Sequence, residues 1–335
     1  MKKYFLLLTL LTFRNLLFSQ TVNRVDAVGI TVADMDRAIN FFTKILPFEK
    51  ISEVEVYGTE YERLKGVFGI RYKKVRLRLG EEEIELTDYL TPGGRLIPED
   101  SRSNDLWFQH IAIVVSNMDS AYARLKKFNV QHVSTGPQTL PKSIPAAEGI
   151  KAFYFRDPAG HNLELIYFPP GKGNPKWQQP YSNRGDKIFL GIDHTAIGIA
   201  QTEASKKFYG ELLGVKYQGE SFNKGIEQEH LNNVKDASLH ISGNKAPEGM
   251  GVEFLEYLFP KNGRSYPIDE RADDLIHYET IFASSEIDSL YKKLTDKKLS
   301  IISTGIISIP STQYGYTRGF YLRDTDGHVI GIFEK

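Results

Sequence analysis

The sequence predicts an α+β fold built from four copies of one module, each consisting of a strand, a helix and three further strands. The first observation is a long repeat, because the segments beginning at Val25 and Lys151 recur at Ile192 and Arg318, in both cases 167 positions later. The second is a shorter repeat, in which GITVADMDRA from Gly29 resembles AIVVSNMDSA 83 positions later. The third is the order of apolar patterns within each copy, which alternate, then follow helical spacing, then alternate again.

The first strand and the helix of a module are predicted from the spacing of apolar residues. In the first copy the alternating apolar positions are Val28, Ile30 and Val32. After a turn, apolar residues recur at helical spacing at positions 38, 41, 42 and 45. A strand followed by an amphipathic helix is therefore expected at the start of each copy.

The later strands of each module are predicted as hairpins. In the first copy Lys74, Arg76 and Arg78 alternate with Val75, Leu77 and Leu79, and we expect the basic residues on a solvated outer face. In the second copy a strand turns at residues 157–160, the sequence DPAG, which is typical of a turn. His161 follows this turn and His328 follows the corresponding DTDG, so both are expected to face solvent.

The long repeat divides the chain into two domains, residues 22–170 and residues 187–335, each expected to pair its own two modules. Residues 171–186 are rich in Pro, Gly and polar residues and are predicted to be a linker. The segments 91–105 and 260–274 connect modules and carry Arg and Asp at matched places. We interpret them as structural crossovers and not as lids.

The first twenty residues are predicted to be a secretory signal peptide. Lys2 and Lys3 precede an apolar run from Tyr4 to Phe13, and Ser19 supplies a small residue before polar sequence resumes. The run is too short to span a bilayer, which requires about 20 apolar residues. The expected location of the protein is therefore periplasmic or extracellular, with no membrane span after cleavage.

Composition narrows the possible functions. The 42 Lys and Arg residues balance 42 Asp and Glu residues, so the chain lacks the basic excess of nucleic-acid-binding proteins, and its expected partner is a small molecule. Because there is no Cys, a metal ion can be held only by His, carboxylate, amide or water ligands. The sequence has no Gly-rich phosphate loop and no GxSxG nucleophile elbow. Its oligomeric state is left open.

The repeated module resembles a known superfamily. The features that carry the resemblance are the opening strand IDHTAIGI, the helix ending FYGELLG and the hairpin FRDPAGHNLELI. They are similar to the vicinal oxygen chelate superfamily, which includes glyoxalase I, epimerases, extradiol dioxygenases and bleomycin-resistance proteins. The resemblance covers nearly all of residues 24–335. It implies that modules pair into two open, half-barrel-like mixed sheets, each able to hold one divalent metal ion on its concave face.

The resemblance also implies which residues hold the metal, namely those at one position of the first strand and one position of the last strand of each module. The aligned first strands place these residues at the first position: Ala27, His110, His194 and Glu279. The aligned last strands place these at the second: Glu85, Glu164, Glu253 and Gly331. One site is therefore expected from Glu85, His110 and Glu164, and another from His194, Glu253 and Glu279.

One imidazole and two carboxylates suit Zn²⁺, Mn²⁺, Fe²⁺, Ni²⁺ or Mg²⁺. Such an ion can polarise a carbonyl and stabilise an enediolate, and Glu164 or Glu85 could act as general base. We therefore expect an isomerase or lyase that acts on a small substrate with vicinal oxygens.

Two alternatives remain open. The protein could be a metal-free small-molecule-binding protein of the bleomycin-resistance type. It could also be an extradiol-type dioxygenase, but those enzymes use two His and one Glu. Since neither expected site supplies that trio, the dioxygenase ranks below the isomerase or lyase.

Overall fold

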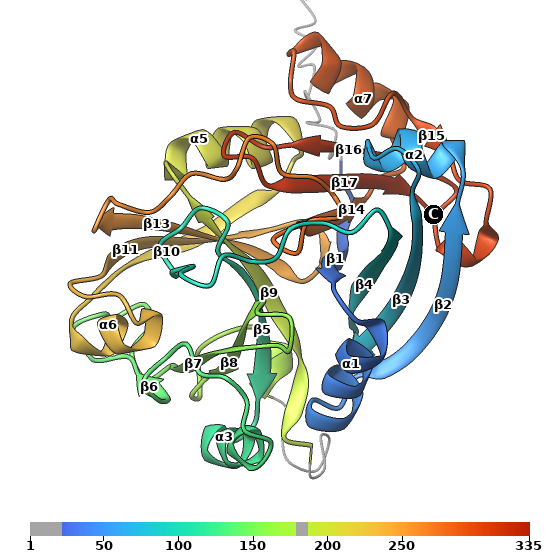
Figure 1. Ribbon diagram of the computed structural model, residues 1–335. Helices are drawn as coiled ribbons and strands as arrows, with labels where there is room; N and C mark the ends of the chain where they lie inside the picture. The colour runs from blue at the N-terminus through green and yellow to red at the C-terminus, as the bar shows by residue number, and fades with distance from the viewer. Residues whose placement is uncertain (1–21, 179–186) are drawn as a thin grey trace, which may run out of the picture.

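A computed structural model describes residues 22–178 and 187–335 and contains the four modules that the repeats predict (Figure 1). The expected signal peptide lies outside the described residues, as does the second half of the expected linker. The first half of the linker contains a short 3-10 helix, η2 (Pro175–Gln178). Within the described part of the chain, no helix has the length and hydropathy needed to cross a membrane.

The first and third modules share one plan, with a second helix between their second and third long strands. The first module consists of β1 (Arg24–Val32), α1 (Met35–Asn40), η1 (Phe41–Ile45), β2 (Glu49–Tyr57), α2 (Thr59–Lys65), β3 (Arg71–Leu79) and β4 (Glu82–Thr91). The third consists of β9 (Phe189–Ile199), α5 (Thr202–Lys206), η3 (Lys207–Leu212), β10 (Lys216–Lys224), α6 (Ile226–Asn232), β11 (Ser238–Lys245), β12 (Glu248–Gly249) and β13 (Gly251–Phe259).

The second and fourth modules have a longer first helix and a very short second strand. The second consists of β5 (Gln109–Val115), α3 (Met118–Lys127), β6 (Gln138–Thr139), β7 (Lys151–Arg156) and β8 (Asn162–Tyr167). The fourth consists of β14 (Tyr278–Ala283), α7 (Ile287–Asp296), β15 (Ile307–Ser308), η4 (Thr312–Tyr314), β16 (Arg318–Arg323) and β17 (Val329–Glu334).

The predicted helix of the first module begins and ends for identifiable reasons. Asp34 caps it, because its carboxylate accepts a hydrogen bond from the backbone N–H of Arg37 at 2.9 Å. After α1 the chain widens into the π-helical turn η1, where the backbone N–H of Leu46 donates to the carbonyl oxygen of Phe41 at 3.1 Å. This turn buries Phe41 and Phe42 in the core, as the apolar spacing predicts.

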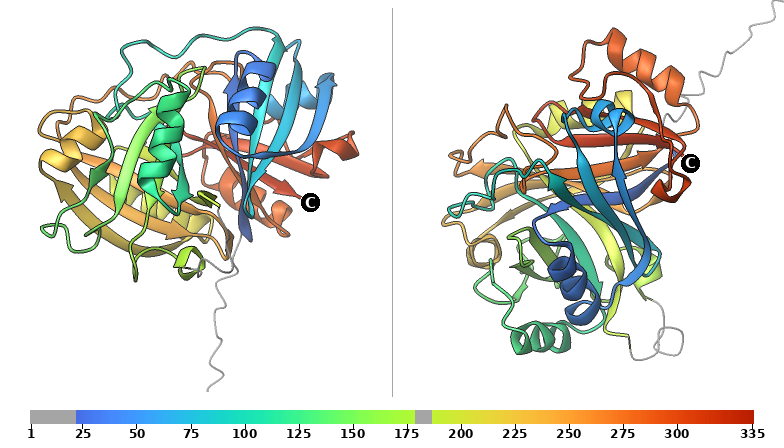
Figure 2. Two further views of the ribbon diagram at one scale, coloured as in Figure 1. Left: turned by 90° about the horizontal axis from the view of Figure 1, so that it is seen from below. Right: turned by 45° about the vertical axis from the view of Figure 1, so that its right-hand side comes forward.

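The strands form two curled, open, mixed sheets, which confirms the predicted fold class. The first sheet has the order β15-β16-β17-β14-β1-β4-β3-β2, with β12 paired to β1. The second has the order β10-β11-β13-β9-β5-β8-β7-β6. Figure 2 shows them side by side, one containing the blue and red ends of the chain and the other its green and yellow middle.

The expected pairing of modules within each half of the chain is wrong. The first module pairs with the fourth through antiparallel β1 and β14, where Val28 lies opposite Thr280. The second pairs with the third through antiparallel β5 and β9, where His110 lies opposite Ala196. The repeat identifies which modules are related, but every module has an equivalent first strand, so the repeat does not determine which two edges meet. We call these the outer sheet, with modules one and four, and the inner sheet, with modules two and three.

One apolar core is continuous between the two sheets. Its buried side chains include a residue from the first strand of each module: Val28, Ile113, Ile197 and Phe282. Along β5, Ile111 and Ile113 belong to this core. Successive side chains of a strand point to opposite faces, so His110, next to Ile111, lies on the other face of the sheet. The alternation therefore directs the polar residues of the first strands to the concave faces.

The two crossover segments contact each other reciprocally. Arg95 pairs with Asp274 at 2.6 Å, and Arg264 pairs with Asp105 at 2.7 Å. These contacts support the structural role predicted for both segments.

His161 and His328, which follow the DPAG and DTDG turns, are buried, so their predicted exposure is wrong. His161 is buried between the carboxylate of Asp157 and the carbonyl oxygen of Leu275, at 2.8 and 2.7 Å. His328 makes the equivalent contacts with Asp324 and Leu106. Each turn packs against the opposite crossover segment, a long-range contact that the turn sequence alone does not reveal.

Candidate metal centre

Two histidines from different halves of the chain meet on the concave face of the inner sheet. His110 lies on β5 and His194 on β9, and their ring centroids are 5.9 Å apart. In the register of these antiparallel strands, His194 lies opposite Ala112, two residues beyond His110, so both side chains point to the same face.

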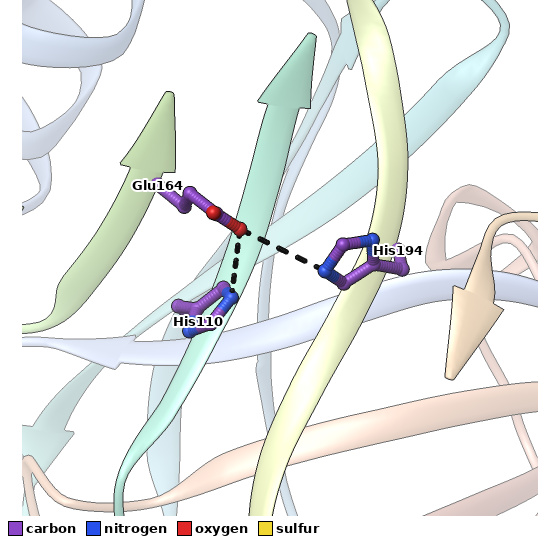
Figure 3. Close-up of side chains that lie close together, drawn as sticks. All are labelled: His110, Glu164 and His194. Carbon is purple, nitrogen blue, oxygen red and sulfur yellow. Dashed lines mark ion pairs between the residues drawn. The ribbon is translucent and has the colours of Figure 1, made fainter. Parts of the chain in front are cut away.

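Two carboxylates complete the cluster (Figure 3 draws the first of them). Glu164, on β8, places its Oε2 3.1 Å from Nε2 of His110 and 3.7 Å from Nε2 of His194. Glu253, on β13, places its Oε2 3.4 Å from the same nitrogen of His194. The four residues therefore converge around His194, and they come from the first and last strands of modules two and three.

The imidazole nitrogens that face the cluster lack ordinary partners. His110 is fully buried, yet neither of its ring nitrogens makes a hydrogen bond within residues 22–178 and 187–335. Nε2 of His194 is likewise without a hydrogen bond to any described residue. Buried polar atoms normally have partners, so these nitrogens are available to a ligand.

The spacing fits a metal ion. One ligand atom from each of His110, Glu164 and His194 lies within 4.8 Å of the others. Ligand atoms about 2.1 Å from a common ion are separated by roughly 3 to 3.5 Å, which matches the shorter distances in the cluster. His110, Glu164 and His194 are therefore suited to hold one divalent cation with nitrogen and oxygen ligands, and Glu253 lies beside His194 as a further carboxylate.

A β-bulge orients His194. The register between β5 and β9 shifts so that Asp193 has no partner residue on β5. Its carboxylate lies 3.0 Å from Nδ1 of His194 and also accepts a hydrogen bond from the indole N–H of Trp177. A carboxylate that binds Nδ1 leaves Nε2 free to coordinate and fixes the ring orientation.

The charges of His194 and Glu253 stabilise each other. Burial disfavours the cationic form of His194, but Glu253 and Asp193 outweigh burial and raise its pKa well above the usual value. Burial also opposes ionisation of Glu253, yet His194 and His110 lower the pKa of this carboxyl group. The lowered pKa favours the ionised form of Glu253, the form in which a carboxylate binds metal.

A cavity of about 220 Å³ gives access to the cluster. Its walls include Glu164, His194 and Glu253, together with Ile241 and Gly243 of β11. A small substrate in this cavity would contact both carboxylates.

The outer sheet places Glu85 away from His110, so the expected grouping of Glu85, His110 and Glu164 is wrong. Glu85 is buried and pairs with Lys74 at 2.9 Å and Arg76 at 3.1 Å. The expectation that these basic residues face solvent is wrong for Lys74 and Arg76, although Arg78 is exposed as expected. Arg76 lies opposite Glu85 in the β3–β4 register and therefore shares its face.

Glu279 is also in the outer sheet, so its grouping with His194 and Glu253 is wrong as well. Its carboxylate is paired with the buried Lys65, accepts a hydrogen bond from the hydroxyl group of Tyr321 at 2.8 Å, and lies 2.8 Å from Nε2 of His277. Burial opposes its ionisation, but Lys65 and His277 hold its pKa far below the usual value. Ammonium and imidazole groups of the chain thus take the place of a cation.

Ala27 and Gly331, the two aligned positions that have no side chain able to bind a metal ion, both belong to the outer sheet. A Cβ atom at Gly331 would lie 2.7 Å from the ring of Phe333 and 2.8 Å from that of Tyr321, so a Glu does not fit there. Among the described residues, the group that could hold a metal ion lies in the inner sheet, and the outer sheet has carboxylates at only two of its four aligned positions.

Sequence reasoning identified His110, Glu164, His194 and Glu253 but not Asp193. The residue 167 positions earlier is Asp26, which lies at the equivalent bulge in β1 and binds Arg76 and Tyr316. Since Asp is present at the bulge in both halves, sequence comparison alone does not single out Asp193 as a site residue.

Four βαβββ modules that pair into two curled, open, mixed sheets define the glyoxalase/dioxygenase fold. Residues 24–165 and 191–332 match the Glyoxalase/Bleomycin resistance protein/Dioxygenase superfamily, and the chain belongs to this superfamily.

One curated relative and several solved structures are similar to the chain. A 2-epi-5-epi-valiolone epimerase from Actinomyces sp is 32% identical over 152 residues, which cover 44% of this chain and 80% of the relative. A glyoxalase I mutant from Zea mays has a TM-score of 0.61 at 14% identity, with 93% of this chain and 92% of the other covered. A putative dioxygenase from Bacillus subtilis has a TM-score of 0.58 at 12% identity, with 94% and 86% covered. These structures show the shared fold.

Proposed function

We propose that the protein is a divalent-metal-dependent isomerase of the epimerase type that acts on a small substrate with vicinal oxygens. The observation that carries this proposal is the convergence of His110, Glu164 and His194 beside a cavity that Glu253 also lines, with imidazole nitrogens that make no hydrogen bond to a described residue. The epimerase relative at 32% identity supports an isomerase over a lyase.

The chemistry divides between the ion and the two carboxylates. A bound divalent ion would supply Lewis acidity, which polarises a substrate carbonyl and makes the neighbouring C–H bond more acidic. Glu164 and Glu253 approach His194 from different strands and both line the cavity. One carboxylate, displaced from the ion by the substrate oxygens, would remove a proton from the carbon beside the carbonyl and pass it to solvent. The other, after taking up a proton from solvent, would return it to the opposite face of that carbon.

The general base proposed from sequence is thus kept at Glu164, whereas Glu85 is replaced by Glu253. The two residues occupy equivalent positions in their last strands, but the carboxylate of Glu85 is occupied by Lys74 and Arg76. Glu253 has no Lys or Arg partner among the described residues and faces the cavity.

Metal content and solvent exchange test the proposal. The full chain, purified after supplementation with Mn²⁺, Fe²⁺, Ni²⁺ and Zn²⁺ in turn, is expected to retain about one ion and to catalyse deuterium incorporation beside the carbonyl of a 2-hydroxyketone in D₂O. His110→Ala and His194→Ala should lose both properties, whereas the exposed His132→Ala should keep them. Retention of metal and exchange by both site variants would refute the proposal.

A second candidate is an extradiol-type dioxygenase. The sequence ranked it low because neither expected site contained two His and one Glu, but that reason no longer holds, since His110, His194 and Glu164 converge. Oxygen consumption with catechol by the Fe²⁺-loaded protein would favour the dioxygenase, and deuterium exchange without oxygen consumption would favour the isomerase.

A further inference from the structure

A chain of three amide side chains runs along one wall of the cavity beside the candidate metal centre. Asn223, on β10, donates from Nδ2 to Oε1 of Gln228, on α6, at 2.9 Å, and Gln228 donates in turn to Oδ1 of Asn232. All three residues are buried, and Asn223 and Gln228 line the cavity. The wall is therefore polar where a substrate would lie.

The amide chain leaves one acceptor unused. Oδ1 of Asn223 has no hydrogen-bond partner among the residues that the structure describes, although the residue is only 3% exposed. Because Nδ2 of the same amide is engaged by Gln228, the remaining group is a carbonyl oxygen that can only accept. Leaving such an atom unsatisfied costs free energy, which points to a ligand that donates a hydrogen bond.

The outer sheet shows that the fold does not require this wall. The residues 167 positions before Asn223, Gln228 and Asn232 are Val56, Tyr61 and Lys65, which form no amide chain.

The cavity lies on the inner sheet, where small or apolar residues replace two basic residues of the outer sheet. Arg76 and Lys74 fill the space before Glu85 in the outer sheet, whereas Gly243 and Ile241 occupy the equivalent positions and line the cavity in the inner sheet. The amide wall and the open cavity therefore occur together.

Another part of the cavity lining is apolar. It is formed by side chains of the loop between β6 and β7 and of β8, including Leu140, Ala147, Ile150 and Ile166. A ligand that fits both parts has hydroxyl groups along one edge and a carbon face elsewhere.

We propose that the substrate has, besides the vicinal oxygens at the candidate metal centre, a further hydroxyl group that donates a hydrogen bond to Oδ1 of Asn223. The placement of the vicinal oxygens rests on the proposed function, whereas the contact with Asn223 depends only on the cavity. Asn223 and Gln228 are thus specificity-determining residues.

Isothermal titration of the full chain, with and without Zn²⁺, tests this inference with two probes, a pentahydroxycyclohexanone and 2-hydroxycyclohexanone. The second probe has the vicinal oxygens but no further hydroxyl group. Asn223→Val, which installs the residue found at position 56, is expected to weaken binding of the first probe about tenfold and to change binding of the second less than twofold. Gln131→Val is the control, because it removes an exposed amide that does not line the cavity.

Should Asn223→Val fail to fold, Asn223→Ser replaces it, since it shortens the side chain but keeps an oxygen. It is expected to weaken the first probe more than the second. Equal effects on both probes, no effect on either, or no binding of the pentahydroxycyclohexanone by the wild-type protein would overturn the inference. Asn223-dependent binding by a protein that retains no metal would support the inference while refuting the proposed metal-dependent function.

Discussion

His110 and His194 lie on neighbouring antiparallel strands although they belong to different halves of the duplicated sequence, and their rings approach to 5.9 Å between centroids. This relationship places both imidazoles of the candidate centre in one sheet. It leaves the other sheet with two carboxylates, Glu85 and Glu279, that are neutralised by basic side chains of the chain itself. Ion pairs thus occupy both carboxylates of the outer concave face, whereas Glu164 and Glu253 of the inner face line a cavity.

Asp193 should strengthen metal binding through His194. Asp193→Asn is expected to reduce affinity for Zn²⁺ about 10- to 100-fold, because the carboxylate that binds Nδ1 is lost. Competition with a chromogenic chelator measures this affinity. Asp26→Asn changes the equivalent residue of the outer sheet and is the matched control, expected to leave the affinity unchanged. An equal loss in both variants would indicate a general effect on the fold.

Gly243→Arg should close the inner cavity as Arg76 closes the outer one. Gly243 lies opposite Glu253 in the β11–β13 register, as Arg76 lies opposite Glu85, and a Cβ atom at Gly243 would meet no other atom within 4 Å. We expect the variant to fold, to pair its new guanidinium with Glu253, and to lose metal and isomerase activity. Gly243→Ala is the control. Full metal retention by Gly243→Arg would contradict the equivalence of the two faces.

Lys65 should stabilise the fold and not the metal site. Lys65→Met leaves Glu279 buried without its ammonium partner and is expected to lower the free energy of unfolding in urea by about 3 to 5 kcal/mol. Lys50→Met, which breaks an exposed pair with Glu53, should cost less than about 1 kcal/mol. The metal content of both variants should equal that of the wild type. Similar unfolding free energies for the two variants would show that the buried ion pair contributes no more to stability than the exposed one.

The outer sheet should make stability depend on pH through His277. Burial disfavours its cation, but Glu270 and Glu279 outweigh burial and raise its pKa to about 9. A histidine with a raised folded-state pKa stabilises fully below its unfolded value of about 6.5, and this contribution is lost as the pH rises to about 9.

Between pH 6.5 and 9 the wild type should therefore lose up to about 3 kcal/mol of unfolding free energy relative to His277→Gln. Urea titrations of both proteins across this range measure the difference, in which the titration of other groups cancels. His132→Gln, at an exposed position, controls for the substitution. Parallel stability curves for wild type and His277→Gln would contradict the assignment.

The sequence predicts the modules well because their strands and helices depend on local periodicity and turns. It also identifies His110, Glu164, His194 and Glu253 as possible ligands, since these follow from strand positions. Their grouping was wrong because the pairing of first strands is a long-range choice between equivalent edges.

One further difference was readable from the repeat, namely that Arg76 corresponds to Gly243. A long basic side chain beside one Glu and a glycine beside the other indicates which face is open. The bulge at Asp193 and the burial of His161 depend on contacts between segments far apart in the chain, which local patterns do not encode.

The central claim is that one metal centre is formed, between the second and third modules. Anomalous diffraction from crystals of the full chain grown with Mn²⁺ or Zn²⁺ tests it most directly. We predict a single anomalous peak within coordination distance of His110, Glu164, His194 and Glu253. A peak beside Glu85 or Glu279, or no peak between the two histidines, would contradict the claim.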